Sequence, residues 1–388
     1  MNKSCLIGFL MCSAFSLVVQ AATDGAHITK TISQIERKKG IKRTIQYRPD
    51  GNDFVCVNGK NRYTRALYGG ITDFRIETSD RPVFAAYKPK DSKHICFRLQ
   101  CGNQSIALDS LKFCEARYRA GRRTYRLTDP LLGKGELNIS VLAFPDAEGG
   151  IWRFTMKDMP EGALLHCYIS EIRAKNLSRN GDMGADRADS FDAPQLPKEQ
   201  KHYKLSLDGT TAYIVVEDQE LRLPALVEGT SLYDKSEKWR SEIESSLQIS
   251  TPDPYFNPLG GALAADGIWD GKIWLHGAIG WRSQLNGWRA AYIGDFIGWH
   301  DRARTHFDSY AASQVTDVPA TIPHPTQDTA LHLARSVKKW GTPHYSNGYI
   351  CRTPYRKDQM HHYDMNLCYI DELLWHFNWT GDLGYLRK

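Results

Sequence analysis

The chain of 388 residues is long enough to form two domains, each with its own hydrophobic core. Hydrophobic residues make up 41% of the sequence, which is typical of a globular protein and excludes an intrinsically disordered chain. The formal net charge of +6 is mild, so we expect no nucleic-acid partner, although this balance suits an acidic polysaccharide.

Residues 1–21 have the three regions of a secretory signal peptide. Lys3 supplies the positive charge, Leu6–Val19 form the apolar segment, and the residues up to Ala21 form a small-x-small cleavage site. This apolar run is too short to span a bilayer, and no later segment is apolar enough to do so. We therefore expect a periplasmic or secreted protein, cleaved near Ala21, with no integral membrane segment after cleavage.

The cysteine pattern argues against a disulfide framework. Cys5 and Cys12 leave with the signal peptide, and the remaining seven of the nine cysteines are scattered and contain no Cys-x-x-Cys motif. An odd number of widely spaced cysteines permits one disulfide in an oxidising compartment, but it does not indicate a zinc site.

Residues 22–41 are polar and charged and are expected to form a flexible lead-in, whereas residues 42–228 have the pattern of an antiparallel β-sandwich domain. Gly and Asp turns separate many short strands, and no helical run lies between them. Asp50-Gly51-Asn52 is typical of a hairpin turn. Strands are predicted at Thr44–Tyr47, Phe54–Val57, Phe74–Glu77, His94–Cys101, Gln104–Leu108, Leu111–Ala120, Arg123–Asp129, Leu137–Ala143, Trp152–Lys157, Ala163–Ile172 and Ala212–Val216.

An arginine-rich hairpin lies inside this β region. Its arginines alternate with Tyr118 and Tyr125 around Ala120-Gly121, which predicts a hairpin with a basic outer face. A solvated face is the first interpretation, and contact with an acidic glycan is the second. The arginines concerned are Arg117, Arg119, Arg122, Arg123 and Arg126.

The pattern becomes helical after residue 228. A linker helix is predicted within residues 229–254, running from Leu232 to about Ile249 and stopped by the prolines that follow Thr251. Its expected apolar face consists of Leu232, Trp239, Ile243 and Leu247. Further helices are predicted in the region 255–388, over residues 256–268, 296–315, 329–340 and 363–379.

The last of these helices has well-marked ends. Gly381 is expected to close it, and Asp382 is expected to cap a new helix that begins at Leu383. The face expected to be buried consists of Tyr363, Leu367, Ile370, Leu374 and Phe377.

The stretch from His276 to Asp295 mixes glycine with tryptophan and arginine and has little period, so it is expected to be a loop. Nine of the ten tryptophans of the chain lie after residue 230. Aromatic faces stack on sugar rings, and arginines bind hydroxyl or carboxylate groups, so the expected partner is an oligo- or polysaccharide. The substrate-binding candidates are Trp281, Arg282, Gln284, Trp288, Arg289 and Tyr292, with packing inside a core as the alternative for the tryptophans.

Two stretches carry a resemblance to a known family. They are Gly280-Trp281-Arg282 through Gly294-Asp295 to Trp299-His300-Asp301, and Tyr363-Asp364-Met365-Asn366 through Trp379-Thr380-Gly381-Asp382. They look like helical hairpins of six-hairpin glycosidases, and in particular of the exported bacterial proteins of the domain of unknown function 4450 family. The resemblance covers about residues 250–388.

This resemblance implies a fold class as well as an activity. Relatives place an N-terminal β-sandwich before an (α/α)6 toroid of twelve helices, whereas only about four to five helices are predicted here. An open half-toroid would leave apolar helix faces in water, so the sequence is expected to be the N-terminal fragment of a longer protein. The implied activity is that of a glycoside hydrolase on a plant-type or other complex polysaccharide.

Glycoside hydrolysis usually requires two carboxyl groups, and the catalytic candidates are Asp295 and Asp371. A helix N-cap is the alternative for Asp295. Asp301 is expected to form a surface ion pair, and Glu372 to be solvated. Relatives that release rhamnose carry an acid just before the Gly-Trp pair, where this chain has Arg282-Ser283-Gln284. The general acid is then Asp295, lies beyond residue 388, or does not exist.

Two other classes of function remain open. His361, His362 and Tyr363 suit the base and acid of a polysaccharide lyase acting on an acidic glycan, and a non-catalytic glycan-binding protein or truncated remnant is the third reading. Adjacent histidines point apart and lack a third ligand at suitable spacing, so no metal site is expected. No nucleophile elbow, phosphate-binding loop or dinucleotide fingerprint is present, so no cofactor is expected.

Overall fold

The computed structural model describes residues 47–60, 63–70, 74–88, 91–172, 201–265, 291–314 and 363–388, with residues 316, 327–328, 333–334, 348 and 350. The predicted signal peptide and lead-in lie outside the described residues. No helix in these described ranges is both long and apolar enough to cross a membrane.

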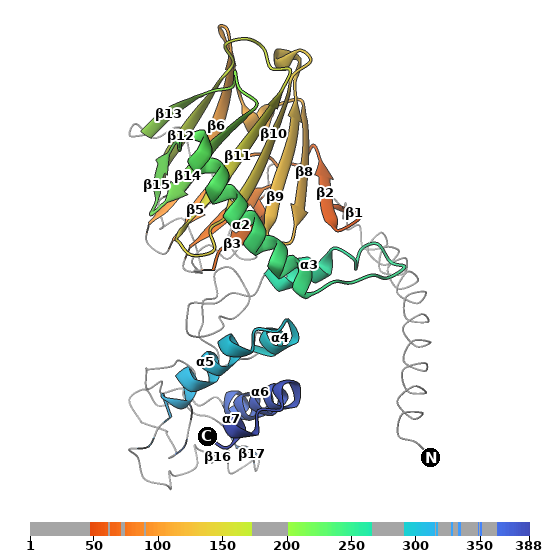
Figure 1. The fold of residues 1–388 in the computed structure, drawn as a ribbon, viewed down its shortest axis with the longest axis vertical. Helices are drawn as coiled ribbons and strands as arrows, with labels where there is room; N and C mark the ends of the chain where they lie inside the picture. The colour runs from red at the N-terminus through yellow and green to blue at the C-terminus, as the bar shows by residue number, and fades with distance from the viewer. Residues whose placement is uncertain are drawn as a thin grey trace.

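Two antiparallel sheets make up the N-terminal part of the chain (Figure 1). The first has the order β1 (Arg48–Asp50), β2 (Asp53–Val57), β8 (Phe113–Arg119), β9 (Arg122–Thr128), β10 (Glu136–Ala143), β11 (Gly149–Lys157), β14 (Thr211–Glu217) and β15 (Glu220–Arg222). The second has the order β13 (Lys201–Ser206), β12 (Leu164–Ile172), β6 (Ser92–Cys101), β5 (Phe84–Tyr87), β4 (Arg75–Ser79) and β3 (Tyr63–Tyr68). A further strand, β7 (Gln104–Ala107), pairs with β6.

The strands predicted between residues 54 and 216 are all present, with ends that shift by up to three residues. The hairpin turn at Gly51-Asn52 is also confirmed, although its first strand is Arg48–Asp50. Sequence reasoning missed β3, β5, β13 and β15. Strand β5 is buried on both faces and therefore lacks the alternation that identifies a half-buried strand.

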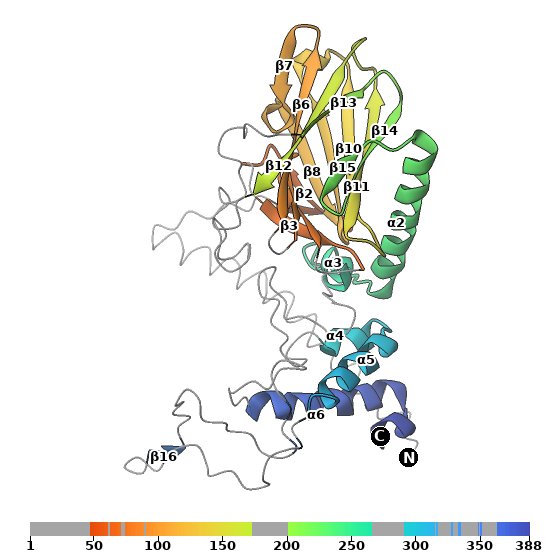
Figure 2. The same cartoon turned by 90° about the vertical axis from the view of Figure 1, so that its left-hand side faces the viewer.

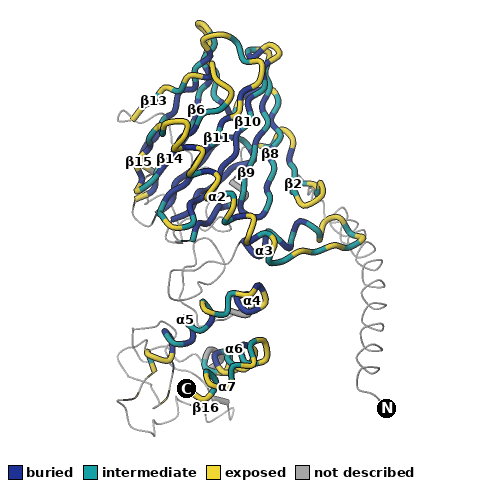
Figure 3. Tube along the Cα trace, viewed as in Figure 1, coloured by how far each residue is buried: buried dark blue, intermediate teal, exposed yellow. Residues whose placement is uncertain are grey.

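The two sheets enclose an aromatic core. Phe84 packs edge-to-face on Tyr125 and Trp152, with ring centroids 5.6 Å apart in both pairs, and Phe97 packs on Phe154 at 5.5 Å. The central strands β10 and β11 are mostly buried, whereas β9 alternates between buried and partly exposed residues (Figure 3). Burial of this core stabilises the sandwich. No disulfide contributes within the described residues, where the six cysteines are all free.

The arginine-rich hairpin is formed by β8 and β9. Arg117, Arg119 and Arg122 point away from the core, as the alternation with tyrosine predicted. The prediction was wrong for Arg123, which is fully buried and donates to the Thr78 and Tyr47 hydroxyls at 3.2 and 2.9 Å. Successive strand residues face opposite sides, so Arg123 shares the inner face with Tyr125.

Helix α2 (Leu226–Ser246) lies on the outer face of the first sheet, over β10, β11 and β14 (Figure 2). It begins six residues earlier than predicted. Its buried stripe is Gly229, Tyr233, Ser236, Arg240 and Ile243, so of the four predicted apolar positions only Ile243 is fully buried. The stripe includes polar groups because they find partners on the sandwich: Arg240 donates to the Tyr68 carbonyl at 2.6 Å.

Helix α3 (Leu259–Ala265) packs against the end of α2, and its many small residues allow the two helices to approach closely. A Cβ atom at Gly260 would lie 2.7 Å from the Leu247 carbonyl oxygen, so only glycine fits there. The prediction extended this helix to residue 268, but residues 266–268 lie outside the described part of the chain.

The remaining helices are α4 (Ala291–Phe296), α5 (His300–Ala311), α6 (Tyr363–Thr380) and α7 (Leu383–Leu386). Helix α6 and the cap that follows it are confirmed: Gly381 has a φ of 66°, and the Asp382 carboxylate accepts from the Tyr385 amide at 2.9 Å. The helix predicted over 296–315 is present as α5 but is shorter at both ends, because Gly298, at a φ of 83°, separates it from α4. The loop expected over 276–295 was wrong for its last residues, which belong to α4. Within the predicted helix 329–340, β17 (Leu333–Ala334) instead pairs with β16 (Gln327–Asp328).

The expected buried face of α6 was also wrong. Leu367, Ile370 and Leu374 are 68%, 56% and 47% exposed, respectively. The buried side chains on this helix include Glu372 and His376, a polar pair one turn apart. The polar stripe is buried because His376 finds a hydrogen-bond partner on α4, and such a bond compensates for its desolvation.

The contact between α2 and the sheet leads to a stability prediction. A Cβ atom at Gly229 would lie 2.4 to 2.8 Å from ring and Cβ atoms of Tyr213. Gly229→Ala should therefore lower the free energy of unfolding by about 1–3 kcal/mol, despite the better helix propensity of alanine. Chemical denaturation would measure this. The control is Gly209→Ala, whose added Cβ meets nothing closer than 3.9 Å; equal stability of the two variants would contradict the packing argument.

Candidate functional site

The candidate site lies where α4, α5 and α6 meet. Asp295, on the last turn of α4, is only 5% exposed. Its carboxylate accepts from the His300 Nδ1 atom at 2.8 Å and from the His376 Nδ1 atom at 2.8 Å. Asp295 is therefore not a helix N-cap, the alternative that the sequence left open; it joins three helices through two imidazoles.

His376 is the most enclosed member of this cluster. Its side chain is 1% exposed, and its ring packs against Phe307 and Tyr385, with centroids 5.7 and 5.4 Å away. Nδ1 faces Asp295, while Nε2 has no hydrogen-bond partner among the described residues. The bond to Asp295 fixes the ring orientation and leaves Nε2 as the nitrogen open to another group.

Glu372 lies one helical turn before His376 and is 2% exposed. Neither of its carboxyl oxygens has a hydrogen-bond partner within the described part of the chain. Burial raises the pKa of Glu372 to about 9, and the neighbouring Asp371 adds to this shift. The carboxyl group therefore keeps its proton at neutral pH, as a general acid must.

The expectation that Glu372 is solvated was wrong. Consecutive helical residues lie about 100° apart, so Asp371 and Glu372 cannot share one face. The structure turns Glu372 inward and leaves Asp371 exposed. The sequence could not decide this, because the inward face of α6 is set by its packing against α4 and α5. The catalytic role of Asp371 stays a prediction.

The other predicted site residues have different outcomes. Trp281, Arg282, Gln284, Trp288 and Arg289 lie outside the described residues, as do His361 and His362. Tyr292 belongs to α4, where only its backbone is described. The predicted surface ion pair is confirmed, because Asp301 is 93% exposed and bonds Arg304.

The cluster also offers donors for a metal ion, which the sequence did not lead us to expect. One donor atom from each of Asp295, His300 and His376 lies within 4.8 Å of the others. Two imidazoles and a carboxylate form a common donor set for divalent transition metals. Hydrogen bonds at 2.8 Å already account for the positions of these atoms, so the donor set permits a metal without requiring one.

Sequence reasoning missed His300, His376 and Glu372. The spacing of Glu372 and His376, at i and i+4, placed both on one face of α6 and was a readable signal. Nothing in the sequence connects Asp295 to His376, since 81 positions separate them and only the packing of α4 on α6 brings them together.

Part of the sandwich matches a known protein family. Residues 89–216 match the model of a family described as Domain of unknown function (DUF4450). The matched segment begins just before β6 (Ser92–Cys101) and ends within β14 (Thr211–Glu217), so it confirms the resemblance to this family over the sandwich. The resemblance of residues 250–388 lies outside the match and stays a prediction. A search of curated proteins finds no match to the chain.

The burial of Glu372 leads to a pH prediction. Its pKa rises from 4.5 in the unfolded chain to about 9 in the folded protein, so the unfolded chain releases this proton first. The free energy of unfolding therefore falls as pH rises through this window. Glu372→Gln removes the cost of burying an ionisable carboxyl group. The free energy of unfolding of this variant should therefore exceed that of wild type, by about 1 kcal/mol at pH 5 and about 4 kcal/mol at pH 8.

Denaturation at both pH values would measure this gain. Asp301→Asn, an exposed carboxylate on the neighbouring helix, is the control and should follow the wild-type pH profile. Parallel profiles for wild type and Glu372→Gln would show that Glu372 ionises normally.

Proposed function

We propose that this chain belongs to an exported glycoside hydrolase that acts on a complex polysaccharide, with Glu372 and Asp295 as its two carboxyl groups. The observation that carries the proposal is the contrast between these two buried groups. Glu372 retains its proton at neutral pH because burial raises its pKa to about 9. Asp295 instead serves as the acceptor for two imidazole nitrogens. Pairs of carboxyl groups in contrasting environments are typical of acid–base catalysis on sugars.

In this proposal each residue has one task. Glu372 donates its proton to the oxygen of the departing sugar, and Asp295 acts on the opposite side as base or nucleophile. His376 is a positioning residue, because it contacts Asp295 and lies one turn from Glu372 on the same helix face. This assignment replaces the pair Asp295 and Asp371, since Asp371 is exposed.

The loop before α4 supplies the sugar-binding groups in this proposal. Trp281 and Trp288 stack on sugar rings, while Arg282, Gln284 and Arg289 bind hydroxyl groups. Support comes from the position of Asp295, which follows this loop in sequence and belongs to the buried cluster.

We also propose that the helical part begins an (α/α)6 toroid and that the protein is exported. The packing of α4, α5, α6 and α7 on one another is consistent with the opening hairpins of an (α/α)6 toroid. The signal-like residues 1–21 support export to the periplasm or beyond.

Substitution of the two carboxyl groups tests the activity. Glu372→Gln and Asp295→Asn should each lower the rate of polysaccharide hydrolysis by about 100-fold or more, the usual contribution of acid–base catalysis. Release of reducing ends from a panel of polysaccharides is the measurement. Asp301→Asn should keep the wild-type rate, because this carboxylate is exposed and pairs only with Arg304 among the described residues.

Other outcomes would redirect the proposal. If Asp371→Asn abolished hydrolysis and Glu372→Gln did not, Asp371 would be the acid. An unsaturated product that absorbs in the ultraviolet would indicate a lyase. Binding without any turnover would leave a non-catalytic glycan-binding protein.

The binding loop has its own test. Trp288→Ala should weaken oligosaccharide binding about 5- to 10-fold, which corresponds to about 1 kcal/mol for one lost stacking contact. Isothermal titration would measure this change. Trp379→Phe, at a half-exposed position near the end of α6, is the control. Unchanged affinity in Trp288→Ala would remove this residue from the proposed site.

A further inference from the structure

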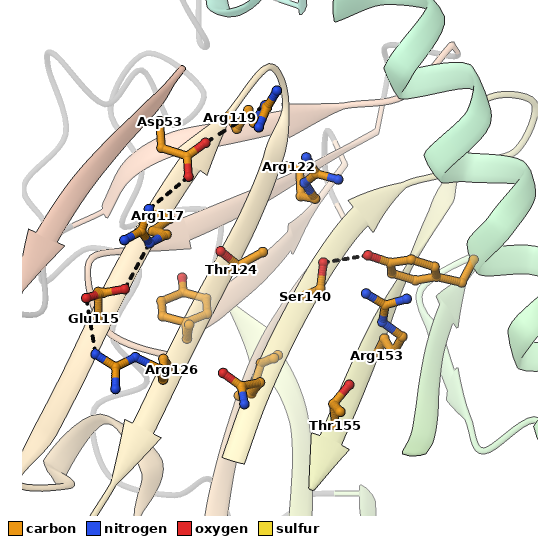
Figure 4. Close-up of a pocket in the computed structure, with 14 residues that line it drawn as sticks. Asp53, Glu115, Arg117, Arg119, Arg122, Thr124, Arg126, Ser140, Arg153 and Thr155 are labelled. Atoms are coloured by element: carbon orange, nitrogen blue, oxygen red, sulfur yellow. Dashed lines mark hydrogen bonds and ion pairs between the residues drawn. The ribbon is translucent and has the colours of Figure 1, made fainter. Parts of the chain in front are cut away.

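A groove of about 360 Å³ lies in the outer face of the first sheet, beside α2 (Figure 4). It is separate from the helical cluster and is built by the outward side chains of β8, β9, β10 and β11. Tyr233 of α2 closes one side and is held by a 2.7 Å hydrogen bond to Ser140. The floor of the groove is the sheet, so the pairing of the strands sets the positions of its side chains.

Strand pairing arranges these side chains in two rows. In one row, Arg117 pairs with Thr124, Thr124 with Ser140, and Ser140 with Arg153. In the other, Glu115 pairs with Arg126, Arg126 with Asn138, and Asn138 with Thr155. A row of four strands is roughly 14 Å wide at the usual spacing between strands. The first row therefore offers two hydroxyl groups in the middle and an arginine at each end. The second row has the charged pair Glu115 and Arg126 on one side, and the amide of Asn138 and the hydroxyl of Thr155 on the other.

Most arginines of the groove are neutralised by neighbours. Arg117 bonds Glu115 at 2.8 Å and Asp53 at 3.1 Å. Arg119 bonds Glu244 of α2 at 2.6 Å, and Arg122 bonds Glu237. The pairs of Arg119 and Arg122 attach α2 to the sheet. Because all three arginines are neutralised by carboxylates, they have little charge left for a ligand.

Arg153 differs from the other arginines of the groove. It pairs with no carboxylate in the part of the chain that the structure describes, and its buried Nε atom has no hydrogen-bond partner there. Its guanidinium lies over the Tyr233 ring, 3.9 Å from the centroid. A stacked, oriented guanidinium with free donors suits two-point recognition of a carboxylate or sulfate.

We propose that this groove binds an anionic saccharide, with its acidic group on Arg153 and its hydroxyls on Thr124, Asn138 and Thr155. The mixed lining favours a saccharide over a nucleic acid, because Asp53 and Glu115 would repel a continuous phosphate backbone but can accept from sugar hydroxyls. All of the strand residues except Asp53 fall within the segment 89–216 that matches the family model. The proposal does not depend on hydrolysis by the helical cluster.

The test is titration calorimetry of the whole chain with three probes: an oligogalacturonate, a sulfated oligosaccharide and a neutral glucan oligosaccharide. We expect one acidic probe to bind better than the neutral one, and the preferred probe identifies the anion. Arg153→Gln should weaken this binding at least about tenfold, since it removes a charge-assisted bidentate contact. Arg153→Lys should restore part of the affinity, because lysine keeps the charge but lacks the planar fork.

The matched control is Arg98→Gln, which removes one arginine from the second sheet, where Arg98 bonds Ser105. Asp301→Asn, at an exposed carboxylate outside both proposed sites, should bind like wild type. Because this test measures binding and not turnover, a failure of the hydrolase proposal is distinguishable from a failure here. If Arg153→Gln fails to fold, as judged by thermal unfolding, Thr155→Val takes its place and should weaken binding severalfold. A duplex DNA titrated in the same way serves as the nucleic-acid control. Three results would overturn the proposal: no preference for either acidic probe, equal weakening by Arg98→Gln, or binding of this DNA with a steep salt dependence.

Discussion

The attachment of α2 to the sandwich is the constraint on which much of this structure depends. Arg240, 2% exposed, donates to the Tyr68 carbonyl, while Gly229 lets the helix backbone approach the Tyr213 ring. A buried arginine is costly to desolvate, so its hydrogen bonds fix one position of the helix more strictly than apolar contact would. That position places Tyr233 against the sheet and gives α3 a surface on which to pack.

The helical part has a different physical character. Its described core combines Phe307 and Tyr369 with Asp295, Glu372 and His376, and the apolar side chains on the opposite face of α6 are exposed. Burial of an ionisable group costs free energy that packing elsewhere must offset. A carboxyl group that avoids this cost by keeping its proton, as Glu372 does, becomes an acid at neutral pH. The same burial therefore reduces stability and supplies a reactive group.

The two candidate sites use the fold in opposite ways. On the sandwich, strand register sets side chains in rows at a fixed spacing, and a groove of polar groups follows from the alternation of the strands. In the helical part, three helices from distant segments bring single residues together. A sheet surface suits recognition of an extended chain, whereas a helix junction suits chemistry at one point.

The sequence by itself determined the elements whose signals are local. The strands from residue 54 to 216, the turn at Gly51-Asn52 and the cap at Asp382 could all be predicted, because alternation and turn chemistry act within a few residues. Only the tertiary structure decided which face of α6 is buried, that Arg123 faces the core while Arg153 lines a groove, and that Asp295 meets His376. These outcomes depend on partners far away in the sequence, and a helix with apolar and polar groups on several faces carries no local signal of which partner it will meet.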